Sequence, residues 1–290
     1  MSPKPASALR LEVVPSRDLA DQLPRIYEPP GAVSVTCLPH HGPSRTVTAS
    51  VELAGLGYHV VPHLAARSIA SQSELHGLLD RLGEAGITEL FLVGGDRRAP
   101  AGPYSWSGPL IRDVRDFSSS FSVGIAGYPE GHPALTSHQL RSGLKAKSAL
   151  AASLTTQMCF SADAIADYVE ALHEAGHQLP VWIGVPGPVN TKKLLSMGAR
   201  LGVGRSLKLA RGTGMARALL GWKNFMDFDS KGLIRDIRKR LAHDPLIAGF
   251  HVYSFNDLGR LPGLLKGISE FESAPPLPPR EAGPLYPSKI

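Results

Sequence analysis

The chain has 290 residues, 43% of them hydrophobic and 19% charged, with a formal net charge of +6. Its 25 prolines and 30 glycines are spread along the chain, which excludes a long low-complexity tract, and no apolar run approaches the roughly 18 residues that a membrane span needs. Lysines and arginines concentrate at 190–223 and 231–240, where they alternate with leucines at helical spacing. We therefore interpret them as solvated helix faces and expect no nucleic-acid partner.

Short β-rich runs recur along the chain, and most are separated by stretches with apolar residues at helical spacing. In order, the runs are LRLEVV (9–14), AVSVTCL (32–38), YHVVPHL (58–64), ELFLVGG (89–95), FSVGIAGYP (121–129), SLTTQMCF (153–160), LPVWIGVPG (179–187) and GFHVYSF (249–255). Helices are predicted at 71–85 and 161–175, because each stretch begins at a serine N-cap and is followed by a glycine. Strands that alternate with helices indicate parallel βαβ units.

This alternation predicts an α/β fold, a single-domain (β/α)₈ TIM barrel, because about eight βα units fit into roughly 260 residues. The structural rival is a doubly wound open sheet, but no G-x-G-x-x-G follows the first strand. We assign residues 1–8 to a disordered N-terminus, 9–272 to the barrel and 273–290 to an extended, proline-rich tail. The long segment 202–230 is expected to hold an extra helix.

A carboxylate lies at the centre of the first predicted strand, LRLEVVP (9–15). Buried parallel strands are near-continuous apolar runs, and an unpaired buried charge is costly, so Glu12 must be paired, protonated or used. In a barrel, the C-terminal ends of the strands and the loops after them build the active site. That rule selects a polar set of ten residues: Glu12, Thr36, His63, Asp96, Tyr128, Glu130, His132, Gln157, Asn190 and Asn256.

Two other features are predicted to be structural. Cys37 and Cys159 lie in strand-like segments and are expected to be buried thiols rather than a disulfide. HEAGH (173–177) matches the H-E-x-x-H zinc pattern by letter. That pattern needs both histidines on one helical face, and Gly176 lies where the helix should end, so we expect no metal site.

Taken together, these segments resemble the methylenetetrahydrofolate reductase family, flavoprotein barrels that reduce 5,10-methylenetetrahydrofolate to 5-methyltetrahydrofolate. The resemblance runs in order through about residues 9–268. LEVVPSRD is similar to the family's F-E-F-F-P-P-R, VSVTCLPHHGPSRTVTAS to V-S-V-T-Y-G-A, VVPHLAARS to A-P-H-L-T-C, and LVGGDRRAPAG to L-R-G-D-x-P. GIAGYPEGHP is similar to V-A-A-Y-P-E-x-H-P, LTTQMCF to I-T-Q-F-F-F, WIGVPGPVNTKKL to G-I-L-P-V-S-N-F-K, and FHVYSFN to F-H-F-Y-T-L-N.

Carried over position by position, the resemblance implies roles for the polar set. Glu12 matches the family's general acid, and Asp96 matches the aspartate that hydrogen-bonds the pterin. The substrate-binding positions implied are Thr36, Gln157, Tyr253, Phe255 and Asn256. The positions implied at the cofactor are His63, Tyr128, His132, Lys147, Gly187, Asn190 and Thr191.

The sequence departs from the family mainly where the family holds its flavin. The helix after YPEGHP is shorter than in the family, and positions that carry polar flavin contacts there become Leu140, Gly143 and Ala146, with only Lys147 retained. A flavin phosphate usually needs several N–H or cationic donors. We therefore expect the folate side of the site to be kept and a bound flavin to be absent.

The function implied is reduction of 5,10-methylenetetrahydrofolate by hydride taken directly from NADH or NADPH, with Glu12 as the general acid. Protonation of N10 helps to open the aminal ring, and a buried carboxylic acid with a raised pKa suits that step. GVPGPVNTKK (184–193) follows the seventh strand and opens a helix, a common phosphate site in barrels, although a tight turn explains its glycines equally well. No ribose-reading motif selects NADH or NADPH.

Three alternatives stay open: the same reduction with bound FAD or FMN, a deazaflavin-dependent reductase, and a non-catalytic folate- or nucleotide-binding barrel. The expected partner is a folate, with or without a polyglutamate tail, and no membrane. The N-terminal MSPKPASA lacks the apolar core of a signal peptide, so a cytoplasmic location is expected. The sequence leaves the oligomeric state open.

Overall fold

The computed structural model describes residues 9–188, 230–241 and 244–272 of the chain. The predicted disordered N-terminus (1–8) and proline-rich tail (273–290) lie outside these residues, and so does nearly all of the segment 202–230, for which an extra helix was predicted. These three assignments stay predictions.

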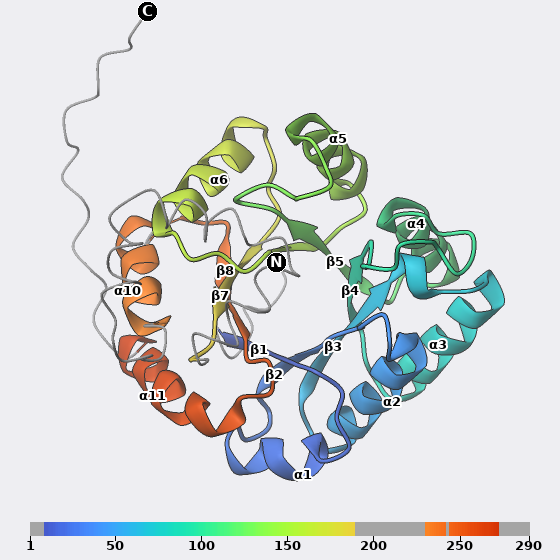
Figure 1. The fold of residues 1–290 in the computed structure, drawn as a ribbon, viewed down its shortest axis with the longest axis horizontal. Coiled ribbons are helices and arrows are strands. Elements are labelled where there is room, and N and C mark those ends of the chain that lie inside the picture. The colour runs from blue at the N-terminus through green and yellow to red at the C-terminus, as the bar shows by residue number, and fades with distance from the viewer. Residues whose placement is uncertain (1–8, 189–229, 242–243, 273–290) are drawn as a thin grey trace, which may run out of the picture.

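Eight parallel strands form a closed barrel in sequence order, with β8 paired to β1 (Figure 1). The strands are β1 (Leu9–Val13), β2 (Ala32–Val35), β3 (His59–Ala65), β4 (Glu89–Val93), β5 (Ser122–Gly127), β6 (Ser153–Thr156), β7 (Val181–Pro186) and β8 (Ile247–Tyr253). Closure of β8 onto β1 confirms the (β/α)₈ barrel and rules out the doubly wound open sheet.

Helices surround the barrel in the ring seen in Figure 1. They are α1 (Leu19–Gln22), α2 (Gly42–Gly55), α3 (Gln72–Glu84), α4 (Ser107–Phe117), α5 (Ser137–Ser148), α6 (Ala162–Glu174), α10 (Ser230–Leu241) and α11 (Leu261–Glu272), with short 3₁₀ turns η1 (Leu23–Arg25), η2 (Ala66–Ser68) and η3 (Leu258–Arg260). None of the helices among the described residues is long and apolar enough to cross a bilayer.

The caps predicted from the sequence are present. The Ser71 hydroxyl accepts a hydrogen bond from the Glu74 N–H at the start of α3, and Ser161 caps α6 in the same way. Helix α6 ends at Glu174, and Gly176 follows with a φ of 75°. His177 therefore lies beyond the helix, so the two histidines of HEAGH do not share one helical face. Both cysteines are free thiols, as predicted; Cys159 is buried, whereas Cys37 is only partly buried.

The alternation of side chains along β1 explains how a buried strand accommodates Glu12. Successive side chains of a strand point to opposite faces of the sheet. Leu9, Leu11 and Val13 belong to the large apolar cluster that includes side chains of the surrounding helices. Arg10 and Glu12 point the other way, into the barrel, where polar partners from other strands meet them.

Arg10 occupies the lower part of the barrel interior. Its guanidinium donates to Glu89, the first residue of β4, at 2.8 Å, and stacks 4.2 Å from the ring centroid of Trp182. The positive charge is thus paired at the N-terminal end of the barrel, one inward-facing position below Glu12. Glu12 is left to interact with neutral groups.

Candidate active site

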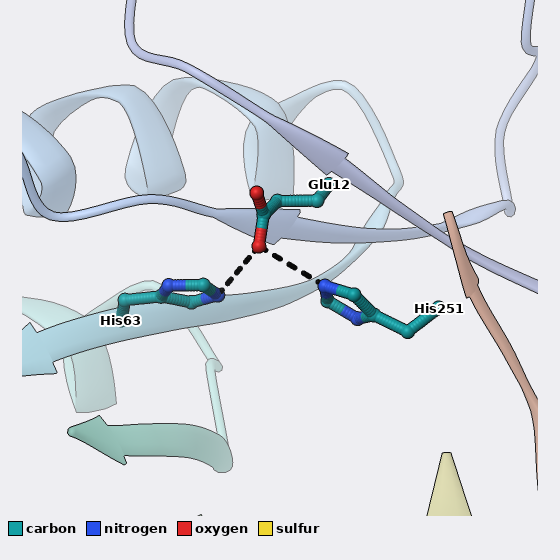
Figure 2. A group of neighbouring side chains, drawn as sticks. All are labelled: Glu12, His63 and His251. Atoms are coloured by element: carbon teal, nitrogen blue, oxygen red, sulfur yellow. Dashed lines mark hydrogen bonds and ion pairs between the residues drawn. The ribbon is translucent and has the colours of Figure 1, made fainter. Parts of the chain in front are cut away.

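Glu12 lies between two histidines inside the barrel (Figure 2). Its Oε2 is 3.1 Å from the Nε2 atom of His251 on β8 and 3.8 Å from the Nε2 atom of His63 on β3. The first distance is a hydrogen bond and the second is too long for one. Strand pairing produces this arrangement, because Glu12 on β1 is in register with Ser34 on β2 and with Tyr253 on β8.

The three side chains are nearly sealed from solvent. The exposed fraction of the side chain is 11% for Glu12, 9% for His63 and 1% for His251. Burial raises the pKa of Glu12 to about 7, with a smaller lowering contribution from His63. A carboxyl group with this pKa is partly protonated at neutral pH and is therefore suited to donate a proton there.

Both imidazoles are neutral at that pH. Burial lowers the pKa of His63 to about 4, against the opposing charge of Glu12, and lowers the pKa of His251 to about 3. The charge of Arg10 also disfavours a second positive charge on either ring. No imidazolium is therefore available to hold Glu12 in its ionised form, and the cluster works with a single titrating proton.

A carboxylate and two imidazoles this close also resemble a metal-binding group. Their three nearest atoms lie within 4.8 Å of one another, and no other His, Cys, Asp or Glu group in the described parts of the chain is so arranged. Measurement of bound metal in the purified protein distinguishes a metal-binding group from a proton-donating carboxyl group.

Asp96, Tyr128 and His132 come together at the C-terminal end of the barrel. Asp96 is an exposed residue just after β4. Burial raises the pKa of Tyr128, and the charge of Asp96 raises it further. Burial lowers the pKa of His132 while Asp96 opposes that shift. The rings of Tyr128 and His132 meet edge to face, with centroids 5.2 Å apart.

Arg67, in η2, holds the loop that carries Asp96. Its guanidinium donates to the backbone carbonyls of Arg97 and Arg98, each at 2.6 Å, and to that of Ser105 at 2.9 Å. The backbone N–H of Arg67 also donates to the carbonyl of Gly94 at 3.0 Å. One side chain therefore fixes both arms of the loop around Asp96.

Thr36 and Gln157 lie just past the ends of β2 and β6. The Oγ1 atom of Thr36 is buried and has no hydrogen-bond partner. The side-chain oxygen of Gln157 accepts from the N–H of Met158 at 2.9 Å, and that bond does not use its NH₂ group. Buried polar atoms are normally satisfied, so the hydroxyl of Thr36 is suited to a bound ligand.

The end of β8 and the residues after it are held by Thr156, the last residue of β6, and by Val14, which follows β1. Tyr253 donates its hydroxyl proton to the carbonyl of Thr156 at 3.1 Å, and its ring lies 4.9 Å from that of His251. The amide of Asn256 bonds both the N–H and the carbonyl of Val14 at 2.7 Å. Phe255 and Asn256 adopt positive φ angles of 51° and 55° at this junction. Their predicted contact with substrate stays a prediction.

The model of the methylenetetrahydrofolate reductase family matches residues 13–204, which is more than half of the chain. The chain belongs to the methylenetetrahydrofolate reductase family. A stretch of 194 residues is 24% identical to methylenetetrahydrofolate reductase 2 of Saccharomyces cerevisiae. That match covers 60% of this chain and 32% of the yeast protein, so the chain spans about a third of the length of this relative.

Solved structures with similar folds include a sialic acid aldolase of Ruminococcus gnavus, at 9% identity and a TM-score of 0.49, covering 90% of this chain and 74% of that one. A monomeric dihydrodipicolinate synthase variant is 12% identical, with a TM-score of 0.40 and coverage of 61% and 62%. With scores this low, we draw no conclusion from either.

The positions that the family resemblance placed at the cofactor do not share one environment in the structure. His63 lies beside Glu12, and Lys147 is a half-buried residue of α5 whose pKa is lowered by burial. A Cβ at Gly187 would lie 2.9 Å from the carbonyl oxygen of Tyr253, so the close approach of neighbouring chain segments is enough to explain this glycine. Asn190 and Thr191 lie outside the described residues.

Sequence reasoning missed His251 and Ser34. His251 was quoted inside the family motif FHVYSFN but was given no role, although period-two alternation puts it on the same face of its strand as Tyr253. Ser34 is two residues before Thr36 and faces the same way. Period-two alternation could have placed both residues on the inward face of their strands. Only the pairing of β8 with β1 shows that His251 meets Glu12.

Proposed function

We propose that this protein reduces 5,10-methylenetetrahydrofolate to 5-methyltetrahydrofolate, with hydride delivered directly by NADH or NADPH and the proton delivered by Glu12. Membership of the methylenetetrahydrofolate reductase family supports the substrate. The single observation that carries the mechanism is the Glu12 carboxyl group, which is enclosed inside the barrel with its pKa raised to about 7. The experiment that tests the function is NADH oxidation that depends on added methylenetetrahydrofolate.

The reaction needs one proton and one hydride. Glu12 protonates N10 of the substrate, and the bond from N10 to the one-carbon unit breaks. The positive charge then lies on an iminium between N5 and that carbon. The nicotinamide C4 hydride adds to the carbon, which yields the methyl group and NAD(P)⁺, and Glu12 recovers its proton from solvent. Asp96 accepts from the amino and ring N–H groups of the pterin and orients the ring.

The residues at the family's flavin positions do not fit a bound flavin. Leu140 and Gly143 of α5 offer no side-chain donor, and a Cβ on Gly143 would meet nothing within 4 Å, so no close cradle surrounds it. Lys147 is the one cation retained there, whereas a phosphate usually takes several charge-assisted hydrogen bonds. The proposed hydride transfer therefore involves no bound flavin.

Purified protein is expected to lack a flavin spectrum. A bound flavin would give an absorption band at about 450 nm, as for any cofactor of that class. The measurement is a spectrum of freshly purified protein, followed by acid release of any bound chromophore. A stoichiometric flavin that co-purifies and is reduced by NADH would contradict direct hydride transfer and favour the FAD or FMN alternative.

Activity and stability should both depend on the protonation of Glu12. Because its pKa is raised from 4.5 to about 7, turnover should fall as pH rises through about 7 and the acid is lost. The same shift costs stability as pH rises from the unfolded-state pKa to the folded-state pKa, since the folded form holds the proton more tightly. Glu12→Gln should therefore melt several degrees above the wild type at pH 8, with the gap closing towards pH 5. Equal differences at both pH values would contradict this.

Arg67 should act on substrate binding through the loop that it holds. Arg67→Met removes three hydrogen bonds to that loop and should raise the KM for methylenetetrahydrofolate about 10-fold, the effect of roughly one charged hydrogen bond, with a smaller change in kcat. Arg67→Lys should recover only part, because one ammonium cannot reproduce the guanidinium fork. The matched control is Arg81→Met, since the Arg81 guanidinium donates to Thr48 on the outer surface. An unchanged KM would remove Arg67 from the site.

A further inference from the structure

The two oxygens of the Glu12 carboxyl group have different surroundings. Oε2 faces both histidines, whereas the other oxygen, Oε1, is turned away from both rings (Figure 2). A carboxylic acid carries its proton on one oxygen only. Which oxygen carries it decides whether the proton is available to a substrate or is directed into the histidine pair.

The tautomer of His251 follows from its second nitrogen. Nδ1 of His251 is buried and has no hydrogen-bond partner. If the ring proton were on Nδ1, a buried N–H donor would be unsatisfied, which is rarer and more costly than an unsatisfied acceptor. The proton therefore belongs on Nε2, which lies 3.1 Å from Oε2 of Glu12 and donates to it.

His63 has the same tautomer for a different reason. The hydroxyl of Ser34 has a single proton, which it donates to the carbonyl of Val61 at 3.1 Å. The oxygen of Ser34 is then the acceptor in its 2.7 Å contact with Nε2 of His63. His63 must supply the proton of that bond, so its Nε2–H points to Ser34, and Nε2 of His63, 3.8 Å from Oε2, is not an acceptor for the proton of Glu12.

We propose that His251 is a positioning residue that donates its Nε2–H to Oε2 of Glu12 and thereby keeps the carboxyl proton on Oε1, the oxygen available to the substrate. A proton on Oε2 would face the Nε2–H of His251 at 3.1 Å and be repelled by it. Once Glu12 has given its proton away, the same N–H of His251 stabilises the carboxylate that remains. The inference rests on the proposed function, because it gives His251 a role in that proton transfer.

The other ionisable groups around the cluster do not compete for this role. From below on β1, Arg10 bonds Glu89. From β8, Tyr253 gives its hydroxyl proton to the carbonyl of Thr156, and burial together with the charge of Glu12 raises its pKa. His63 is committed to Ser34. Among the described residues, His251 is therefore the one group in hydrogen-bond contact with the Glu12 carboxylate.

The tautomer can be measured without any turnover. Protein labelled with ¹⁵N in its histidines should show a neutral His251 ring with the proton on Nε2 from pH 6 to pH 8, and the signal can be assigned by its loss in His251→Gln. A proton on Nδ1, or a charged imidazolium in this range, would overturn the proposal. Stoichiometric zinc or another divalent metal in the purified protein would also overturn it, because the metal would replace the proton.

Kinetics distinguish donation from simple packing. His251→Leu should lower kcat about 10- to 100-fold, the effect of losing one hydrogen bond to a charged group, with little change in KM. Its pH profile should move to higher pH, because the carboxylate has lost a donor. His251→Gln, whose amide NH₂ can still donate, should recover most of kcat. The matched control is His173→Gln, since His173 pairs with Asp244 on the outer surface.

The outcomes separate the two proposals. If His251→Gln is as impaired as His251→Leu, or if both match the wild type, the donor role is wrong. Should His251→Leu fail to fold, the NMR tautomer and the comparison of His251→Gln with the wild type still decide the question. Should the wild type show no oxidation of NADH with methylenetetrahydrofolate, the proposed function fails, whereas the tautomer measurement is unaffected.

Discussion

Glu12→Gln should lose about 10²- to 10⁴-fold in kcat, the usual contribution of a positioned general acid. Glutamine has nearly the same shape, and its side-chain oxygen can still accept from Nε2 of His251. Only the transferable proton is removed. The architecture of the barrel interior and the affinity for folate should therefore survive, so that the loss falls on the chemical step rather than on binding.

The measurement is a pair of numbers for each protein: kcat from the consumption of NADH, and the dissociation constant for 5-methyltetrahydrofolate from titration calorimetry. Glu52→Gln is the matched control, because Glu52 is an exposed residue of helix α2, outside the barrel interior. Near-normal turnover of Glu12→Gln would show that the proton comes from another group. A large loss of binding would show that Glu12 acts on affinity instead.

Asp96→Asn should lower kcat/KM about 10- to 100-fold, as expected for a hydrogen bond to a charged partner. Asparagine keeps the size of the side chain but loses the charge and replaces one acceptor with a donor, which would face the donors of the pterin. Both KM and kcat should suffer, because Asp96 binds the ring and stabilises the positive charge that develops on it.

A spectroscopic effect accompanies this change. The charge of Asp96 contributes to the raised pKa of Tyr128, so Asp96→Asn should lower that pKa, which a pH titration of tyrosine absorbance can follow. Asp116→Asn on the exposed side of α4 is the matched control. If KM, kcat and the tyrosine titration all match the wild type, Asp96 lies outside the site.

Local signals in the sequence were sufficient to predict most of the barrel. Serine caps and terminal glycines located α3 and α6, and apolar runs located the strands, because these features depend on neighbouring residues along the chain. The barrel itself was inferred from the number of βα units. Closure is a long-range event, since it pairs β8 with β1, and no local pattern reveals it.

In the candidate site, too, the residues with local sequence signals were predicted, whereas contacts made by long-range strand pairing were not. Glu12 was identified because a charge inside an apolar run contradicts its surroundings, and Asp96 because it matches a family motif. The partner of Glu12 could not be found in this way, since His251 is 239 positions away in the sequence. The bond between Asn256 and Val14 depends on the same closure. Period-two alternation gives the face of each side chain but not its depth in the barrel.

The most direct test follows deuterium from the nicotinamide C4 position of labelled NADH or NADPH into the product. Direct transfer predicts that, with deuterium on the C4 face from which the hydride leaves, 5-methyltetrahydrofolate carries this deuterium in its methyl group, with none lost to water; label on the other face stays on the oxidised nucleotide. A reduced flavin exchanges its transferable hydrogen with solvent. Product that contains solvent hydrogen in place of the deuterium, formed by protein that carries a flavin, would contradict direct transfer.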